Sequence, residues 1–199
     1  MSAPSDKPKQ RVYVAFDIES AGADLHSPVL AVGVCYGTNA EDRKKQRWCL
    51  KFQRSEIEKR CMDEFWSKHE DILSRIEKEA RDAGAVWKEI ARFIDDLETL
   101  YPQETHKVVF VSDNPAFDIA LIDMNLKRTV GRLPLRYTTA GVYRVINDPS
   151  EQRVWFPKRT EMDAFVRANS SHDHLPDNDA EHIYLMQVFM EKYRLGHKQ

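Results

Sequence analysis

The sequence predicts an α/β protein whose mixed five-stranded sheet, in the order 3-2-1-4-5, is flanked by helices. Residues 12–19 place apolar side chains at alternate positions, the two-residue period of an extended strand. Two further strand-like segments follow after short loops, which is typical of an antiparallel meander. A fourth apolar segment, residues 108–111, comes after a helical region, so we expect it to pair in parallel with the first strand.

The other elements follow from the spacing of apolar side chains. Residues 29–36 are almost wholly apolar, as expected for a strand covered on both faces, and a charged hairpin tip separates them from a third strand over 47–53. Three- and four-residue spacing then predicts two helices, interrupted at Gly84 and stopped by Pro102. The remaining expected elements are helices over 117–124, 161–168 and 179–194 and a fifth strand over 133–137.

Length and composition are those of one soluble globular domain. Of 199 residues, 31 % are charged and 42 % are hydrophobic, and no apolar run approaches the ~20 residues that span a bilayer. We expect a single domain over residues 11–199 after a flexible tail over residues 1–10 that lacks the apolar core of a secretory signal. Three cysteines without metal-site spacing favour a reducing compartment, so we expect a cytoplasmic protein that binds no membrane.

Positive charge is concentrated in one part of the chain. The formal net charge is −2, yet residues 127–159 carry eight lysines and arginines against two acidic residues, a local excess of +6. Such a segment can follow the phosphates of a nucleic acid. A solvated basic surface explains the same charge equally well, so charge alone identifies no partner.

Asp17 and Glu19 end the first predicted strand and, being two residues apart, point to the same face. At ~4 Å and an effective dielectric constant of ~20, two carboxylates repel by roughly 4 kcal/mol. Mg²⁺ or Mn²⁺, which prefer hard oxygen ligands, would relieve this repulsion. The alternative is a solvated strand end, and the choice depends on partners elsewhere in the chain.

Such partners stand at the ends of two other predicted elements. Asp118 lies in the first turn of the helix after the fourth strand, and Asp179 opens the last helix five residues after His174. In the order 3-2-1-4-5, strands one and four end at the crevice where such sheets bind ligands. Carboxylates that converge there predict two divalent cations ~3.5–4 Å apart, the arrangement used for phosphodiester cleavage. A neutral histidine nearby can accept the proton of the attacking water.

Three short motifs occur in order along the chain: F-D-x-E at residues 16–19, N-x-x-F-D at residues 114–118 and H-x-x-x-x-D-A at residues 174–180. Together they resemble the motifs of the DEDDh 3′→5′ exonucleases, a family that includes RNase T and oligoribonuclease. Each motif alone is weak, but all three in order on the predicted elements are a strong signal that spans nearly the whole chain. Residues 65–68 (FWSK) also resemble phage-type exonucleases of this superfamily.

The resemblance implies a ribonuclease H-like fold and a metal-dependent enzyme. Such an enzyme removes nucleotides from a free 3′ end of nucleic acid and releases nucleoside 5′-monophosphates. By resemblance, Asp17, Glu19, Asp118 and Asp179 hold two divalent cations, Mg²⁺ or Mn²⁺, and His174 is the general base. The alternative is a non-catalytic module that binds nucleic acid or protein and keeps the fold. Retention of all five residues argues against it, because binding alone needs none of them.

The loop after Glu19 departs from the commonest family pattern. Many members carry Thr-Thr-Gly there, against the terminal nucleotide, whereas this chain has Ser20 and Ala21 before Gly22. Ser20 keeps a hydrogen-bond donor, but the packing of a base in this loop is left open. Further along, Leu25 and His26 are candidates for contact with the terminal base, with a structural role equally open.

Two candidates for substrate binding belong to the second motif. Asn114 either caps the helix that follows or approaches the substrate, and Phe117 belongs either to the core or to the pocket wall.

The third motif has a second possible alignment, because His172 is also followed by an aspartate, Asp177, five residues later. We favour His174 and Asp179, since Asp179 is expected on the last helix and Asp177 before it. The sequence leaves open the choice between DNA and RNA, between single and double strands, and the oligomeric state.

Overall fold

A mixed sheet lies at the centre of the molecule, whose computed structural model describes residues 8–131, 144–145 and 159–196. Its strands are β1 (Gln10–Ser20), β2 (Val29–Gly37), β3 (Lys44–Cys49) and β4 (His106–Ser112), in the order β3-β2-β1-β4. β2 runs antiparallel to both β1 and β3, and β4 runs parallel to β1. The predicted order and directions of these four strands are confirmed.

A two-residue strand, β5 (Arg144–Val145), pairs in parallel with β4 at Val111 and Ser112. The fifth strand predicted over residues 133–137 lies outside the described residues. So do residues 1–7 and most of the basic segment 127–159, and the expectations for both stay predictions. Within the described ranges, no helix is both long enough and apolar enough to cross a bilayer.

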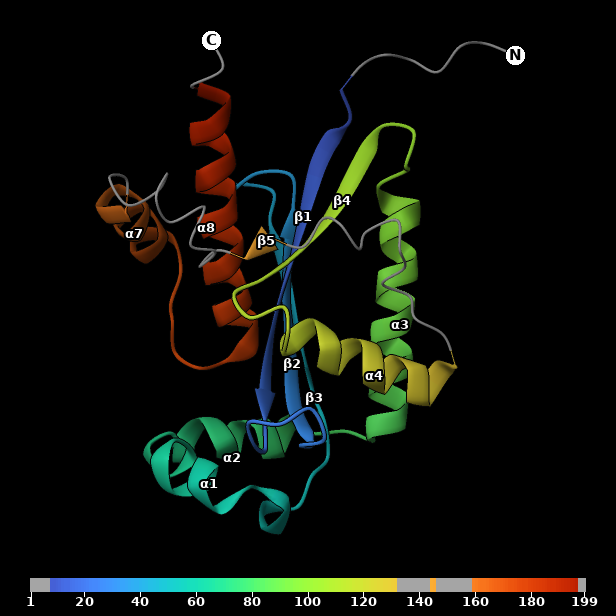
Figure 1. The fold of residues 1–199 in the computed structure, drawn as a ribbon, viewed down its shortest axis with the longest axis vertical. Helices are drawn as coiled ribbons and strands as arrows, with labels where there is room; N and C mark the ends of the chain where they lie inside the picture. The colour runs from blue at the N-terminus through green and yellow to red at the C-terminus, as the bar shows by residue number, and fades with distance from the viewer. Residues whose placement is uncertain (1–7, 132–143, 146–158, 197–199) are drawn as a thin grey trace.

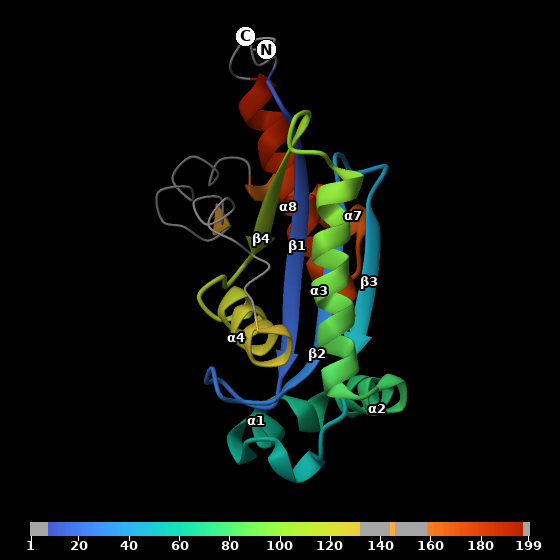
Figure 2. The same ribbon diagram turned by 90° about the vertical axis from the view of Figure 1, so that its right-hand side faces the viewer.

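Helices cover both faces of the sheet. Figures 1 and 2 show α3 (Ala83–Leu100) and α4 (Asp118–Val130) on one face, and α7 (Arg159–Asn169) and α8 (Pro176–Gly196) on the other. Alternate residues of β1 serve the two cores: Val12, Val14 and Phe16 pack on the side of α3 and α4, whereas Tyr13 and Ala15 pack on the side of α8. This two-sided packing explains why β1 is apolar at nearly every position before Asp17.

A layer of short helices gathers beyond the carboxyl end of β1 (Figure 1). The sequence predicted one helical region here, but the structure divides it at Phe65 and His69, which cap successive helices. Trp66 between them is fully buried, and its Nε1 donates a hydrogen bond to the carbonyl oxygen of Ser20 at 3.3 Å. The layer therefore holds the loop that follows β1. Its helices are η1 (Arg54–Glu56), α1 (Lys59–Glu64), η2 (Trp66–Lys68) and α2 (Glu70–Glu79).

Two element boundaries differ from the sequence prediction. β3 begins at Lys44, where a hairpin tip was expected, and ends at Cys49 rather than at residue 53. Two of its charged residues, Lys45 and Arg47, form ion pairs with Glu181 and Asp177 of α8, which makes them compatible with a strand at this place. α8 begins at Pro176, a residue type favoured in the first turn of a helix, so the expectation that Asp177 precedes the helix is wrong.

Candidate active site

The site forms where β1 ends beside the start of α8. Asp17 pairs in register with Gly33 of β2, and Glu19, which is 9 % exposed, pairs with Ala31. One carboxylate oxygen from each of Asp17, Glu19 and Asp179 lies within 4.8 Å of the other two. The structure thus brings together acids that are about 160 residues apart in the sequence.

Asp118 reaches the same region from the other neighbour of β1. It is the first residue of α4 and is 4 % exposed, and the Ser112 hydroxyl donates a short hydrogen bond to its Oδ2. The carbonyl oxygen of Asn114 accepts the amides of Phe117 and Asp118, both at 2.9 Å, which fixes the turn between β4 and α4. Asp118 is not part of the 4.8 Å group, but its charge raises the pKa of both Asp17 and Glu19.

Burial and mutual repulsion act together on these acids. The pKa of Asp17 is raised well above its usual range by burial and then by the charges of Glu19, Asp118 and Asp179. Burial, followed by Asp179 and Asp118, raises the pKa of Glu19 in the same way. Burial also raises the pKa of Asp118 to about 7 and that of Asp179 to about 6, although Ser112 lowers the former and His172 the latter. Ionised together, the four carboxylates need positive charge that their own contacts do not supply.

A glycine lets the start of α8 rest directly on the sheet. A Cβ atom at Gly33 would collide with the main chain of Pro176 and Asp177, so no other residue type fits this position without displacing the helix. Because Gly33 pairs with Asp17, this contact brings the first turn of α8, and with it Asp179, beside the end of β1.

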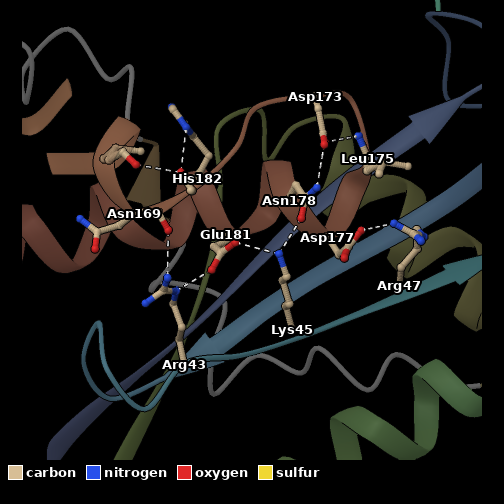
Figure 3. Close-up of polar contacts among 12 residues, drawn as sticks. Arg43, Lys45, Arg47, Asn169, Asp173, Leu175, Asp177, Asn178, Glu181 and His182 are labelled. Atoms are coloured by element: carbon tan, nitrogen blue, oxygen red, sulfur yellow. Dashed lines mark hydrogen bonds and ion pairs between the residues drawn. The ribbon is translucent and has the colours of Figure 1, made fainter. Parts of the chain in front are cut away.

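Basic residues at alternate positions, beginning just before β3 and continuing along it, hold the same helix from the side, as Figure 3 shows. Arg43 Nε and Lys45 Nζ lie 2.6 and 2.9 Å from the carboxylate of Glu181. Arg47, whose side chain is 11 % exposed, forms ion pairs with Asp177 and with Glu79 of α2. Asp177 therefore belongs to this ladder of ion pairs, which Arg43, Lys45 and Arg47 form with α8, and is not part of the acid group of Asp17, Glu19 and Asp179.

Both candidate histidines contact Asp179. Nδ1 of His172 lies 3.1 Å from Oδ1 of Asp179, and Nδ1 of His174 lies 3.8 Å from Oδ2. The His174 side chain is 32 % exposed and packs on His69 and Phe65, with ring centroids 4.3 and 5.1 Å away, whereas that of His172 is 58 % exposed. Burial and then the neighbouring histidines lower the pKa of His174, which favours the neutral form that a base requires.

The backbone of His174 adds a sign of constraint. Its φ of 59° lies in the left-handed region that is costly for residues other than glycine. Such conformations persist where the surrounding structure holds them, and they cluster at functional sites.

A cleft of about 380 Å³ opens beside Glu19, within the ~300–1,000 Å³ range of ligand pockets. Of the six predicted substrate contacts, Ser20, Asn114 and Phe117 line it. Phe117 also packs against the core, so it belongs to both places. The helical layer contributes the opposite wall through Arg60, Cys61, Glu64 and Phe65.

The other three predicted contacts do not line this cleft. Ala21 is 1 % exposed, and its main chain is hydrogen-bonded to Pro28 and Glu58. Leu25 and His26 are exposed on the loop beyond it. The N-cap of α4 is Phe117, without a side-chain capping bond, so Asn114 does not cap the helix with its side chain; its carbonyl oxygen, which accepts the amides of Phe117 and Asp118, orients the helix start instead.

Sequence reasoning missed three residues of the site: Ser112, Phe65 and His69. Ser112 stands directly after the apolar run of β4, and its position two residues before Asn114 was the available signal. Phe65 and His69 looked like the apolar face of a helix. Only the break between the short helices turns both rings toward His174.

The donor set fits hard divalent cations. Asp179 is 6 % exposed, and its Oδ1 makes no hydrogen bond within the described part of the chain. A buried carboxylate oxygen without a donor is costly unless an ion binds it. Asp17, Glu19 and Asp179 offer only oxygen ligands, which suits Mg²⁺ or Mn²⁺.

Comparison with known proteins places the fold. No protein-family model matches the sequence, and no curated protein matches it. Among solved structures, product-bound exonuclease I superposes with a TM-score of 0.59 at 12 % identity, over 94 % of this chain and 45 % of that one. Exonuclease I of E. coli in complex with an oligonucleotide gives 0.56 at 10 % identity, over 93 % and 41 %.

The chain thus has the mixed α/β fold of exonuclease I over nearly all of its own length, consistent with a ribonuclease H-like fold. It spans less than half the length of these proteins.

Proposed function

We propose that this chain is a metal-dependent 3′→5′ exonuclease that hydrolyses phosphodiester bonds at nucleic-acid 3′ ends and releases nucleoside 5′-monophosphates. The observation that carries the proposal is the acid group of Asp17, Glu19 and Asp179, within 4.8 Å and beside a histidine. The exonuclease I fold supports it, because the acids stand at the strand ends where this architecture binds ligands.

Each side chain has a distinct task in this proposal. Asp17, Glu19, Asp118 and Asp179 would hold two divalent cations, Mg²⁺ or Mn²⁺. Such ions activate the attacking water and stabilise the leaving oxygen of a phosphodiester. Ser112 orients the Asp118 carboxylate through its hydroxyl, so it is a positioning residue. His174 accepts the proton of the attacking water, and its lowered pKa keeps the side chain in the neutral form that this role requires.

The cleft beside Glu19 is the proposed site of the terminal nucleotide. Ser20 and Asn114 provide polar groups on one wall, and Phe65 and Phe117 provide aromatic surface against which a base can pack. Exonuclease I, the similar structure, is described in complex with an oligonucleotide and with single-stranded DNA. For this chain, cleavage of DNA and RNA oligonucleotides in the experiment below decides which of the two is the substrate.

A panel of oligonucleotides labelled at the 5′ end tests the proposal. Single- and double-stranded DNA and RNA are incubated with the metal-stripped protein, with Mg²⁺, Mn²⁺ or EDTA. We expect a ladder shortened from the 3′ end that requires metal and disappears in Asp17→Ala, with mononucleotides as product. Full activity in EDTA would exclude the metal mechanism. Binding without cleavage of any substrate would favour the non-catalytic alternative.

A further inference from the structure

Two histidines and one carboxylate form a second donor group beside the acids. Nδ1 of His172 and Nδ1 of His174 lie 3.1 and 3.8 Å from the two oxygens of Asp179. One ligand atom from each of these residues lies within 4.8 Å of the others. Because two of its three donors are imidazole nitrogens, this group differs in chemistry from the all-oxygen group of Asp17, Glu19 and Asp179.

The separations suit a small ion with tetrahedral geometry. Bonds of ~2.0–2.1 Å from Zn²⁺ to nitrogen and oxygen place neighbouring tetrahedral ligands roughly 3.3 Å apart. The 3.1 Å from Nδ1 of His172 to Oδ1 of Asp179 is close to that value, and the ligand atoms of all three residues lie within 4.8 Å of one another. The side chains of His172 and His174 are 58 % and 32 % exposed, which leaves the fourth position open to water.

The burial of Asp179 is a second feature of this group. The residue is more than nine-tenths buried, and its Oδ1 accepts no hydrogen bond in the described residues, while Nδ1 of His172 lies 3.1 Å away, a separation that a bound ion can bridge. His69 and His182 pack on His174 and His172, with ring centroids 4.3 and 5.2 Å away, so both donor rings are held by neighbours outside the group.

We propose that His172, His174 and Asp179 form a site for a borderline transition-metal ion such as Zn²⁺. Imidazole nitrogens favour Zn²⁺ over Mg²⁺, and with equal ligands the divalent affinity order also places Zn²⁺ above Mn²⁺. The site is therefore selective against the ions that the neighbouring carboxylates prefer.

The site has a regulatory consequence that rests on the proposed function. Asp179 belongs to both donor groups, and His174 is the proposed base. An ion bound by His172, His174 and Asp179 takes the lone pair of the His174 nitrogen and one carboxylate from the hydrolytic centre. Zn²⁺ therefore inhibits the Mg²⁺-dependent reaction through binding at this group.

Cobalt spectroscopy tests the binding site directly. The tag-free, metal-stripped full chain is titrated with Co²⁺ in excess Mg²⁺, and the visible bands of tetrahedral Co²⁺ are followed, with Zn²⁺ added to displace it. We expect one Co²⁺ per chain, with affinity at least ~100-fold weaker in His172→Ala and within ~3-fold of the wild type in His182→Gln. His182→Gln is the matched control, because it removes a ring that touches His172 but donates no ligand.

Three results would overturn the site: no tetrahedral bands in the wild type, equal affinity in His172→Ala, or an equal loss in His182→Gln. The activity arm compares, within each variant, the rate of Mg²⁺-dependent cleavage with and without Zn²⁺. We expect the inhibitory Zn²⁺ concentration to rise at least ~100-fold in His172→Ala. If the chain cleaves nothing in Mg²⁺, the proposed function fails while the Co²⁺ titration still decides the site. Cleavage without Co²⁺ bands would overturn the site and leave the proposed function standing.

Discussion

His172 and His174 touch the same carboxylate but differ in their surroundings. His174 is the less exposed and packs edge-to-face on His69 and Phe65, whereas His172 is more exposed to solvent. From the sequence, His174 is favoured because Asp179 is expected on the last helix and Asp177 before it; the first premise is confirmed, and the second is wrong. The structure replaces it with a better one, since Asp177 is bound to Arg47 and is not available to the acid cluster.

We expect His174→Ala to lower kcat by ~10²–10⁴-fold, the usual contribution of a positioned base, and His172→Ala to lower it by less than ~10-fold. Because a base acts in its neutral form and the pKa of His174 is lowered, kcat should fall only below pH ~6.5. Steady-state rates from pH 5 to 8 on a labelled oligonucleotide measure both quantities. A larger loss in His172→Ala would assign the base to His172 instead.

At the scale of elements, the ladder of ion pairs between the basic residues of the β3 region and α8 positions Asp179, because it holds the first turns of that helix. Arg47 is nearly buried between Asp177 and Glu79, so its removal leaves a poorly solvated carboxylate without a partner. We expect Arg47→Ala to lower the free energy of unfolding by ~1–3 kcal/mol and to weaken Mg²⁺ binding at least ~10-fold. Urea unfolding and calorimetric titration measure the two effects.

Arg75→Ala is the matched control for Arg47. It removes an arginine that pairs with the same Glu79, but on the helix surface with 53 % of its side chain exposed. Exposed pairs four residues apart contribute only ~0.3–0.5 kcal/mol. Equal losses of unfolding free energy and of Mg²⁺ affinity in Arg47→Ala and Arg75→Ala would show that the ladder does not position α8.

The second prediction at the scale of elements concerns Gly33. Gly33→Ala forces a side chain into the main chain of Pro176 and Asp177, so we expect a loss of ~1–3 kcal/mol or more and weaker Mg²⁺ binding. Gly84→Ala, in the first turn of α3 where the added Cβ meets only ordinary contact, should be neutral or stabilising by up to ~1 kcal/mol. Thermal melts of both variants measure the difference, and unchanged stability in Gly33→Ala would contradict the close approach.

For the whole molecule, the sequence predicted the strand order and the identity of the acids because both depend on local patterns. The alternation of apolar side chains predicted β1. Because residues 108–111 come after a helical region, they were predicted to pair with β1 in parallel. The extent of β3 could not be predicted, since its charged residues pair across more than 100 residues of sequence, as between Arg47 and Asp177, which are 130 apart. The start of α8 had a local signal in Pro176, which was assigned to the preceding loop instead. The hydrogen bond from Ser112 to Asp118 was not predicted for a related reason: a single serine at the end of a strand has no periodicity.

Stability should depend on pH and metal in a coupled way. The pKa of Asp118 is about 7 and that of Asp179 about 6 in the metal-free fold, above the ~3.9 of an unfolded aspartate. The fold therefore holds protons that the unfolded chain releases, and metal-free stability should fall as the pH rises from ~4 to ~7. Melting curves in EDTA at pH 5 and 8 measure this fall.

Saturating Mg²⁺ reverses the loss. At a hundredfold excess over Kd, a bound ion contributes ~2.7 kcal/mol, which is ~5–10 °C in Tm for a chain of this size. Asp118→Asn should flatten the pH dependence in EDTA. A Tm that rises from pH 5 to 8 without metal, or that ignores Mg²⁺, would contradict the clustered-acid account.

The contact at Gly33 also bears on ionic radius. Strand and helix meet there main chain to main chain, so Asp17 and Asp179 cannot move apart unless α8 lifts from the sheet. Mg²⁺ binds oxygen at ~2.0–2.1 Å, whereas Ca²⁺ needs ~2.3–2.6 Å and more ligands. A fixed spacing between Asp17 and Asp179 selects ions by their radius. Ca²⁺ should therefore bind there only if the contact between Gly33 and the start of α8 is disrupted. Because Gly33 of β2 has no side chain, the packing of α8 on the sheet fixes the spacing of Asp17 and Asp179 and favours Mg²⁺, the smaller ion.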